Sequence, residues 1–435
     1  MNKSNKSLKI QALAASFLFL GSAVSYASPY KVNNQTVLYP VKDRQAPKVK
    51  LPEKPKSEEK TADKRKSAVL KLDVGLLTGQ YSVVVQAGRE ITVRDLNGNK
   101  VLNKFPGKNT ISFTFKSRQL CINGKAVSAK NLLIEADSGI ITVGGDEYRG
   151  EIILQCGSSG ITIVNRVDLE SYVKGVVGTE MSPDWPAEAL KAQAVAARTF
   201  ALYTRDEGKH QGDGYSICAT THCQVYGGTE DESPSVTKAV DGTYGQIMTY
   251  SGKPIYSAFH TDSGGRTAAC REVWGGELAY LASVSDPTGA PNRRWQVTLT
   301  AEQMAAKLKA AGKDVGALKK ITLSPLNMSK PGSGDRYASG RPAKIVIAGS
   351  SRTITINGTQ ARSVFGLKSA LFDFNSGRKG NELTVKSGQR ITIDGYGSGH
   401  GLGLSQWGAK AMAAKYNYQA ILNHYYTGVT ITKLY

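Results

Sequence analysis

The sequence predicts an α+β fold that is rich in strands and has few helices. Three observations support this prediction: a series of short Val- and Ile-rich segments in the first half of the chain, one long segment with helical periodicity after Pro186, and a return to short strand-like segments in the last third. With 40% hydrophobic residues, the 435-residue chain has the composition of a folded protein, and its length has room for two or three domains.

Strand patterns begin at residue 68 and continue to about residue 167. Each segment runs for a few residues and ends at Gly, Asn or Asp; examples are AVLKLDVGLL, TISFTFKS and GITIVNRV. The Asn-Gly pairs at 97–98 and 123–124 indicate hairpin turns. Residues 68–160 are therefore predicted to form a β-rich N-terminal region, followed by a larger domain over 161–435.

The clearest helix follows Pro186, in AEALKAQAVAARTFALYTRDEG. Pro186 suits the first helical turn, Glu188 complements the helix dipole, and Gly208 can end the helix. One face carries five residues, four of them small, so another element can approach it closely: Leu190, Ala194, Ala197, Ala201 and Thr204. Basic residues that recur every seven positions predict a neighbouring stripe: Lys191, Arg198 and Arg205.

The remainder of the chain alternates strands with glycine-rich turns. A short helix is predicted in TAEQMAAKLKAAG, where Thr300 is the cap, and a last helix near LSQWGAKAMAAKYN, before a closing strand in GVTITKL. Between these helices, residues of about 290–390 read as a β-rich insertion in the larger domain.

Residues 1–27 have the layout of a signal peptide. Lysine and polar residues precede an apolar run from Ile10 to about Val24, and small residues at 25 and 27 suit cleavage after Ala27. The run is short for a spanning helix, so an uncleaved anchor is the weaker alternative. Residues 28–67 form a basic, Pro- and Lys-rich linker without apolar periodicity. The mature protein is expected to be exported, to the periplasm or cell wall, with no stable membrane span after cleavage.

Export changes the interpretation of charge and cysteine content. A net charge of +21 would suggest nucleic acid in a cytosolic chain, but an exported chain meets cell-wall polymers and lipid surfaces instead. We therefore expect no nucleic-acid partner. The five cysteines are an odd number, which argues against a disulfide-built scaffold.

Three distant segments are dense in glycine, histidine and aromatic residues. They are GVVGTEMSPDWP at 175–186, then THCQVYGG with AFHTDSGGRT and EVWGG at 221–276, and GYGSGHGLGLSQWGAKAM at 395–412. Glycine-rich loops let the backbone approach a ligand closely, whereas the alternative for any one run is a tight turn. Trp185, Trp274 and Trp407 could offer flat faces to sugar rings.

These segments, in this order, resemble the SpoIID/LytB domain family, that is, peptidoglycan lytic transglycosylases of the stage II sporulation protein D type. The match starts with VDLESYVKGVVGTEMSPDWPAEALKAQAVAARTFALYTR and continues through ICATTHCQVYGG, AFHTDSGGRT and GYGSGHGLGLSQWGAKAMA, over roughly residues 70–432. One departure is mild: many members have Pro directly after Glu-Met, whereas here Ser182 precedes Pro183.

The resemblance implies cleavage between N-acetylmuramic acid and N-acetylglucosamine, with a 1,6-anhydro-muramic end, on strands stripped of stem peptides. It places the catalytic acid on Glu180. It implies substrate-binding roles for a further set of residues, of which Trp274 and Trp407 are also supported by their flat faces: Arg198, Gln224, Tyr226, His260, Ser263, Gly264, Gly265, Trp274, His400, Gly401, Gln406 and Trp407.

A single carboxylate suits this reaction. Most glycosidases use two carboxylates, but here the C6 hydroxyl of the sugar replaces water as nucleophile, so Glu180 alone can act as acid and then base. Its pKa must be raised, and Val176, Val177, Met181 and Trp185 could form an apolar pocket around it. The alternative for Glu180 is an exposed cap or ion-pair partner, and for Arg198 a salt bridge beside the small-residue face.

A metal is one interpretation of the CATTHC segment. Cys218, His222 and Cys223 are ligands of the type that zinc prefers, and some family members carry a metal at this segment. A Cys218–Cys223 disulfide or two buried thiols are the alternatives. The sequence requires no cofactor, whereas His210 and His424 look like ordinary surface or core residues.

Two functions of different classes remain. The first is an exported lytic transglycosylase acting on peptidoglycan glycan strands. The second is a non-catalytic wall-binding protein that activates an N-acetylmuramoyl-L-alanine amidase, a role also associated with relatives of this domain. A cell-wall amidase is therefore a candidate partner.

Overall fold

The computed structural model describes residues 31–32, 35–36, 70–287, 290, 293–375 and 377–435. The predicted signal peptide lies outside the described residues. So does the predicted linker, except for β1 (Lys31–Val32) and β2 (Gln35–Thr36), which pair antiparallel. Helices account for 22% and strands for 35% of the chain, so the predicted strand-rich α+β class is confirmed. Within the described residues, no helix has both the length and the apolar character needed to cross a bilayer.

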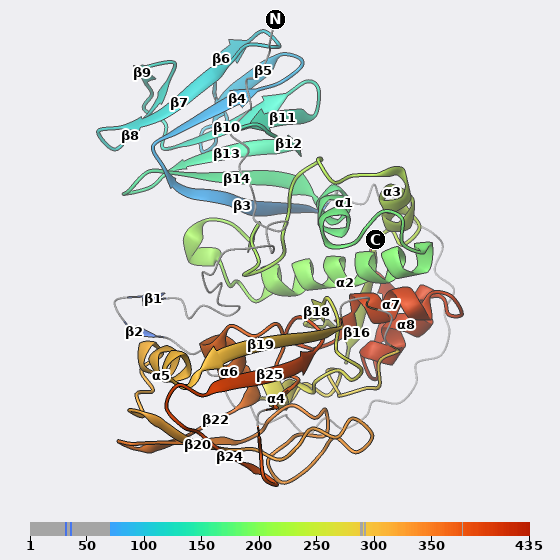
Figure 1. Ribbon diagram of the computed structural model, residues 1–435. Helices are drawn as coiled ribbons and strands as arrows, with labels where there is room; N and C mark the ends of the chain where they lie inside the picture. The colour runs from blue at the N-terminus through green and yellow to red at the C-terminus, as the bar shows by residue number, and fades with distance from the viewer. Residues whose placement is uncertain (1–30, 33–34, 37–69, 288–289, 291–292, 376) are drawn as a thin grey trace, which may run out of the picture.

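Two antiparallel sheets form the N-terminal region, at the top of Figure 1. One has the order β15 (Ile217–Cys218), β3 (Lys71–Gln80), β14 (Ile161–Asp168), β13 (Glu151–Cys156), β10 (Asn131–Ala136), β5 (Ile91–Asp95) and β6 (Val101–Phe105), with β15 added in parallel to β3. The other has the order β12 (Asp146–Arg149), β11 (Ile140–Val143), β4 (Ser82–Gln86), β7 (Ile111–Lys116), β8 (Gln119–Ile122) and β9 (Lys125–Ala126).

The predicted strands of this region are observed, as is the turn at Asn123-Gly124. Both of these residues have positive φ, 47° and 81°, which is the backbone of a two-residue hairpin between β8 and β9. Alternating apolar side chains, among them Val93, Ile111 and Ile134, are fully buried.

Helix α1 (Leu169–Glu180) follows β14 directly, and its N-terminus is capped by the Asp168 side chain, which accepts from the Ser171 amide. It is not predicted, because Gly175 and Gly178 lower the helix propensity of this segment. Both glycines have a packing reason. A Cβ on residue 175 would lie 2.6 Å from the carbonyl oxygen of Gly228. A Cβ on residue 178 would lie 2.0 Å from the carbonyl oxygen of Asp231.

Helix α2 (Ala187–Asp206) agrees with its prediction and crosses the middle of the molecule (Figure 1). All five residues of its predicted small-residue face are buried. The predicted basic stripe is wrong, because the three cations do not share a surface. Lys191 pairs with Glu188 and Arg205 with Asp206, but Arg198 is fully buried.

Arg198 forms a buried ion pair with Glu170 of α1, through Nε–Oε1 at 2.8 Å and Nη2–Oε2 at 2.6 Å. Its Nη1 also donates to the Gln246 carbonyl at 3.1 Å. The Glu170 carboxylate accepts a further hydrogen bond from the Tyr435 hydroxyl, at 2.6 Å. One charge pair therefore joins α1, α2 and the C-terminal residue.

The remaining core elements surround α2. Strands β17 (Lys253–Pro254), β16 (Gln246–Tyr250) and β27 (Thr430–Lys433) form one sheet, and β18 (Phe259–His260) pairs in parallel with β26 (Leu404–Ser405). The helices are the 3-10 turn Gln211–Asp213, α3 (Pro234–Asp241), α4 (Cys270–Val273), α7 (Gln406–Met412) and α8 (Tyr418–Tyr425). Helix α7 is the predicted last helix; α8 is not predicted, although the spacing of its buried Tyr418, Ile421, Leu422 and Tyr425 is readable from the sequence.

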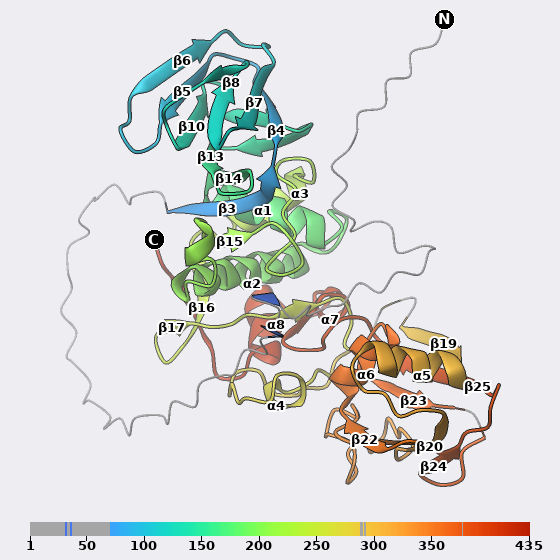
Figure 2. The ribbon, with the colours of Figure 1, turned by 90° about the vertical axis from the view of Figure 1, so that its left-hand side faces the viewer.

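Residues 293–396 form a separate module at the opposite end from the N-terminal sheets (Figures 1 and 2). One sheet has the order β19 (Arg294–Thr300), β25 (Arg390–Tyr396), β23 (Phe372–Phe374), and the other the order β22 (Thr353–Ile356), β21 (Ile345–Gly349), β20 (Leu318–Thr322), β24 (Glu382–Thr384). Helices α5 (Ala301–Ala310) and α6 (Gly358–Phe365) complete it. Thr300 caps α5 as predicted, in a capping box with Gln303.

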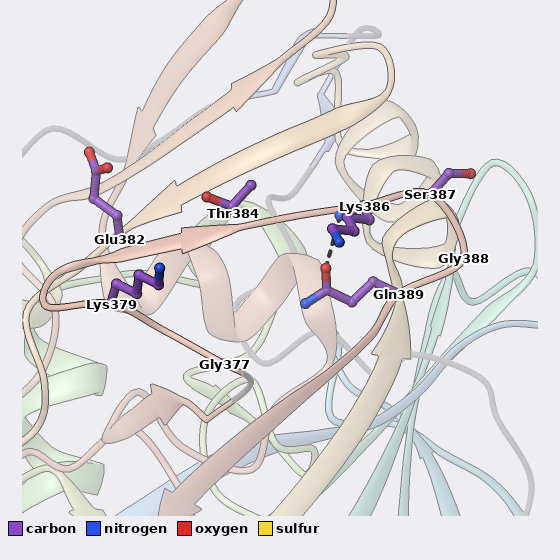
Figure 3. A pocket seen from close by; sticks show the side chains of 8 residues that line it. All are labelled: Gly377, Lys379, Glu382, Thr384, Lys386, Ser387, Gly388 and Gln389. Carbon is purple, nitrogen blue, oxygen red and sulfur yellow. Dashed lines mark hydrogen bonds between the residues drawn. The ribbon is translucent and has the colours of Figure 1, made fainter.

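Figure 3 shows a pocket on this module, along β24 and the turn before β25. Its lining residues are Gly377, Lys379, Glu382, Thr384, Lys386, Ser387, Gly388 and Gln389. None of them is a predicted site residue.

The buried ion pair yields a stability prediction. We expect Arg198→Met to lower the free energy of unfolding by about 3–5 kcal/mol, because it leaves the Glu170 carboxylate buried without its cation. Urea unfolding followed by circular dichroism measures this change. The matched control Arg205→Met removes an exposed pair and should cost under about 1 kcal/mol. Equal losses in the two variants would contradict a special contribution of the buried pair.

Candidate functional site

Glu180 is the last residue of α1 and is half-buried. Its Oε2 accepts a hydrogen bond of 3.0 Å from Nε2 of Gln406, the first residue of α7. Three of the four apolar residues predicted to surround it are buried: Val176, Val177 and Met181. Burial raises the pKa of the Glu180 carboxyl, and the hydrogen bond from Gln406, which favours the charged form, opposes this in part.

Gln406, the hydrogen-bond partner of Glu180, is positioned by a short parallel pair of strands. β18 and β26 place His260 opposite Ser405, and the Trp407 amide donates to the Thr261 carbonyl at 3.1 Å. The Ser405 side chain then caps α7 by accepting from the Gly408 amide. Two of the sequence-distant segments, AFHTDSGGRT and GLGLSQWGAK, therefore lie side by side next to Glu180.

Aromatic side chains flank this junction. The Trp185 and Trp407 rings lie 4.9 Å apart between centroids, and both are half-buried. Trp274 is 41% exposed, packs edge-on against Tyr256, and lies 6.2 Å from the His400 ring. The structure thus brings Gln406 and Trp407 to Glu180, whereas Trp274 groups with the histidines.

His260 and His400 lie 5.4 Å apart between ring centroids. Nδ1 of His260 donates to the Leu402 carbonyl, while Nδ1 of His400 accepts from the Leu402 amide, each at 3.0 Å. Burial holds the pKa of His260 well below its ordinary value and lowers that of His400 to about 4. Both rings are therefore neutral near pH 7. Nε2 of His260 is buried and has no hydrogen-bond partner among the described protein groups, so it can accept from a hydroxyl.

Gln224 and Tyr226 lie beneath α1. The Tyr172 hydroxyl donates to the Gln224 side-chain oxygen at 3.0 Å, and the Tyr226 hydroxyl donates to Asn165 at 2.9 Å. The Tyr172 and Tyr226 rings are 5.0 Å apart. Tyr226 is only 4% exposed, so it supports α1 from below and does not offer its hydroxyl to a ligand.

The Ser263-Gly264-Gly265 turn is also internal. Ser263 is fully buried and its hydroxyl donates to Asp286 at 2.5 Å. Arg341 and Arg293 of the 293–396 module donate to the carbonyls of Ser263 and Gly264. The backbone has positive φ angles at Gly264 (82°) and Gly265 (120°), which explains why glycine occupies both positions.

Gly401 completes this packing, since a Cβ there would lie 2.4 Å from Nη2 of Arg341. The predicted site residues therefore fall into two groups. Glu180, Gln406 and Trp407 belong to the half-buried or adjoining group, whereas Arg198, Tyr226, Ser263 and Gly401 are buried supports.

For Arg198, the salt bridge is the correct alternative, because the side chain is fully enclosed and paired with Glu170.

Asp286 and Arg341 have internal roles that sequence analysis missed. Asp286 accepts from both Ser263 and Tyr425, each at 2.5 Å. The only signal in the sequence is that Asp286 follows the EVWGG segment; Arg341 carries no local signal, because its contacts come from another part of the chain.

Four potential metal ligands meet at the CATTHC segment. All ligand atoms of His210, Cys218, His222 and Cys223 lie within 4.8 Å of one another. Nε2 of His210 is 3.2 Å from Sγ of Cys223, and Sγ of Cys218 is 3.5 Å from Nδ1 of His222. The cysteines are free thiols, so the disulfide alternative is not present in this structure.

His210 corrects the sequence analysis, which treated it as an ordinary surface or core residue. Its ring is 92% buried, and its Nδ1 lies 2.8 Å from Asp213, which fixes the ring with Nε2 toward the cluster. With bond lengths of about 2.3 Å for zinc–sulfur and about 2.0 Å for zinc–nitrogen, tetrahedral ligand atoms lie about 3.5 Å apart. The separations of 3.2 Å between His210 and Cys223 and 3.5 Å between Cys218 and His222 are close to this value.

Comparison with known proteins agrees with these features. Residues 157–250 match the SpoIID family, described as stage II sporulation protein, and residues 271–403 match a domain of unknown function. An uncharacterized protein of Brachyspira hyodysenteriae is 35% identical over 314 residues, which are 72% of this chain and 79% of that protein. Stage II sporulation protein D of Bacillus amyloliquefaciens is 32% identical over 288 residues, 62% of this chain and 76% of that protein.

The amidase enhancer of Bacillus subtilis is 31% identical over 300 residues, 60% of this chain but only 40% of that longer protein. The region matched by the SpoIID model contains α1, α2 and the CATTHC segment. The chain therefore belongs to the SpoIID/LytB family of stage II sporulation protein D.

Proposed function

We propose that this protein is an exported peptidoglycan lytic transglycosylase, in which Glu180 is the single general acid and base. The relatives named for sporulation and for amidase enhancement support a role in the cell wall. The observation that supports the chemistry is the position of Glu180, a half-buried carboxyl with a raised pKa that accepts a hydrogen bond from the Gln406 amide.

In the reaction, Glu180 first donates a proton and then accepts one. Protonated Glu180 donates its proton to the glycosidic oxygen as the bond from that oxygen to the muramic acid C1 breaks. The C6 hydroxyl oxygen of the same sugar then bonds to C1, and its proton passes to the Glu180 carboxylate. No water is consumed, so the reaction needs no second carboxylate to activate one.

Gln406 and the histidine pair supply positioning. The Gln406 amide fixes one Glu180 oxygen and leaves the other for the substrate. Neutral His260 is buried and lies in the β18–β26 ladder that positions Gln406, so it belongs to the support of the site.

A single substitution tests the role of Glu180. We expect Glu180→Gln to abolish release of 1,6-anhydro ends from purified peptide-free glycan strands, measured by mass spectrometry, because the amide cannot donate the acid proton. The exposed neighbour Asp184 gives a matched control, and Asp184→Asn should retain activity.

The amidase-activator function predicts a different outcome. In that case, wild-type protein gives no anhydro ends, and its addition accelerates peptide release by a purified N-acetylmuramoyl-L-alanine amidase. That pair of results would contradict the catalytic proposal.

The pH dependence follows from the protonated form of Glu180. Activity should fall as pH rises through the raised pKa, because the acid is lost. Gln406→Leu removes a hydrogen bond that favours the carboxylate, so the alkaline limb of the kcat/KM profile should move to higher pH. A shift to lower pH would contradict the assignment of that limb to Glu180.

The cluster of His210, Cys218, His222 and Cys223 is proposed as a zinc site. Four protein ligands leave no open position, so the metal would be structural and would fix the loop that leads to Gln224. Bound zinc would stabilise the folded protein, because the four ligands come together only when the chain is folded.

Metal content tests this site directly. Purified protein should contain about one zinc per chain by inductively coupled plasma mass spectrometry, and Cys218→Ser should lose most of it. Cys156→Ser, outside the cluster, is the control. Chelation of wild-type protein should lower its Tm, and added zinc should restore it. Zinc-free protein with an unchanged Tm would refute the proposal.

A further inference from the structure

Lys410 lies on α7, one helical turn after Gln406, the hydrogen-bond partner of Glu180. Its Nζ lies 4.9 Å from the centroid of the Trp185 ring and 4.6 Å from that of Trp407. Cation–π contacts with two indoles hold the ammonium group in place. Lys410 is half-buried, so the ammonium still meets solvent on one side.

The charge of Lys410 is not neutralised. Within the part of the chain that the structure describes, its ammonium forms no ion pair, whereas the nearby Lys174 and Lys191 pair with Asp241 and Glu188. A cation fixed between aromatic faces and lacking a carboxylate partner is preorganised for an anionic group of a ligand.

The position of Lys410 relative to Glu180 limits where that anion lies. Gln406, the partner of Glu180, is four residues before Lys410 on α7, so the two side chains share one face of the helix. Four residues correspond to about 6 Å along a helix axis. A sugar that is bound at Glu180 through its glycosidic oxygen can therefore extend toward Lys410 along this face of the helix.

Only one group of a glycan strand meets this requirement. The hydroxyl and acetamido groups are neutral, and the lactyl group of muramic acid is an amide when it carries a stem peptide. After peptide removal, the lactyl group ends in a free carboxylate. The charge therefore distinguishes stripped strands from peptide-bearing strands at the sugar that is cleaved.

We propose that Lys410, held by Trp185 and Trp407, binds the free lactyl carboxylate of the muramic acid at the cleaved bond and distinguishes this carboxylate from a neutral amide at the same position. This inference rests on the proposed function of Glu180. The indole faces contact the sugar ring, and Lys410 acts as a specificity-determining residue that takes no part in proton transfer.

Two preparations of the same strands test this role. One keeps its lactyl carboxylates, and the other is converted to neutral methylamides by carbodiimide coupling with methylamine. Wild-type full-length protein should form anhydro ends from the first with a kcat/KM about tenfold higher than from the second, in keeping with one charge-assisted contact. Added salt should reduce this ratio.

The variant Lys410→Met should bring the ratio to about one, and Lys410→Arg should keep most of it. Lys415→Met, an exposed lysine after the same helix, is the control and should keep the wild-type ratio. A wild-type ratio near one, or an unchanged ratio in Lys410→Met, would overturn the proposal. So would equal losses on both preparations, which indicate a purely structural role.

Binding separates this proposal from the catalytic one. Calorimetric affinities of wild type and Lys410→Met for the two preparations do not depend on cleavage. If no variant cleaves but wild type binds the carboxylate strands more tightly and Lys410→Met does not, the proposed catalysis fails and Lys410 retains its role. If wild type cleaves but binds and cleaves both preparations equally, the role of Lys410 fails and that of Glu180 remains.

Discussion

The buried ion pair between Arg198 and Glu170 determines where α1 lies, and α1 ends in Glu180. Two hydrogen bonds of 2.6 and 2.8 Å join the guanidinium to the carboxylate, and Tyr435 adds a third contact to the same carboxylate. A bidentate pair of this kind permits little rotation of one helix against the other. Glycines at 175 and 178 then allow the 228–231 segment to approach α1 closely, so the helix is fixed on two sides.

The second half of the site reaches Glu180 through backbone pairing. β18 and β26 are parallel and short, and they place Gln406 against a carboxylate that is 226 residues away in sequence. Arg341 and Arg293 extend from the 293–396 module to the carbonyls of the Ser263-Gly264-Gly265 turn. The inserted module is therefore part of the support for the ladder that carries Gln406. None of its residues is among the proposed catalytic or positioning residues.

The electrostatics of the site follow from this arrangement. The Arg198 guanidinium is held by the Glu170 carboxylate within the buried supports. Glu180 has an amide for its neighbour, and burial rather than a charge dominates its pKa. Had Arg198 faced Glu180, the carboxyl would have been held in its charged form. Lys410 lies against the indoles of Trp185 and Trp407, and within the described residues it forms no ion pair.

The sequence alone determined the fold class, the family and the long helix α2, because strand periodicity, helix capping and motif order are local properties. It also identified Glu180, Gln406 and Trp407, which the structure brings together, although their roles stay predictions. Only the tertiary structure decided which motif residues are supports, since Arg198 and Ser263 are motif residues whose contacts come from distant elements. The same reason explains His210 and Lys410. His210 has no distinctive neighbour in sequence, and Lys410, although it follows Trp407 by three residues, meets Trp185 only in the folded chain.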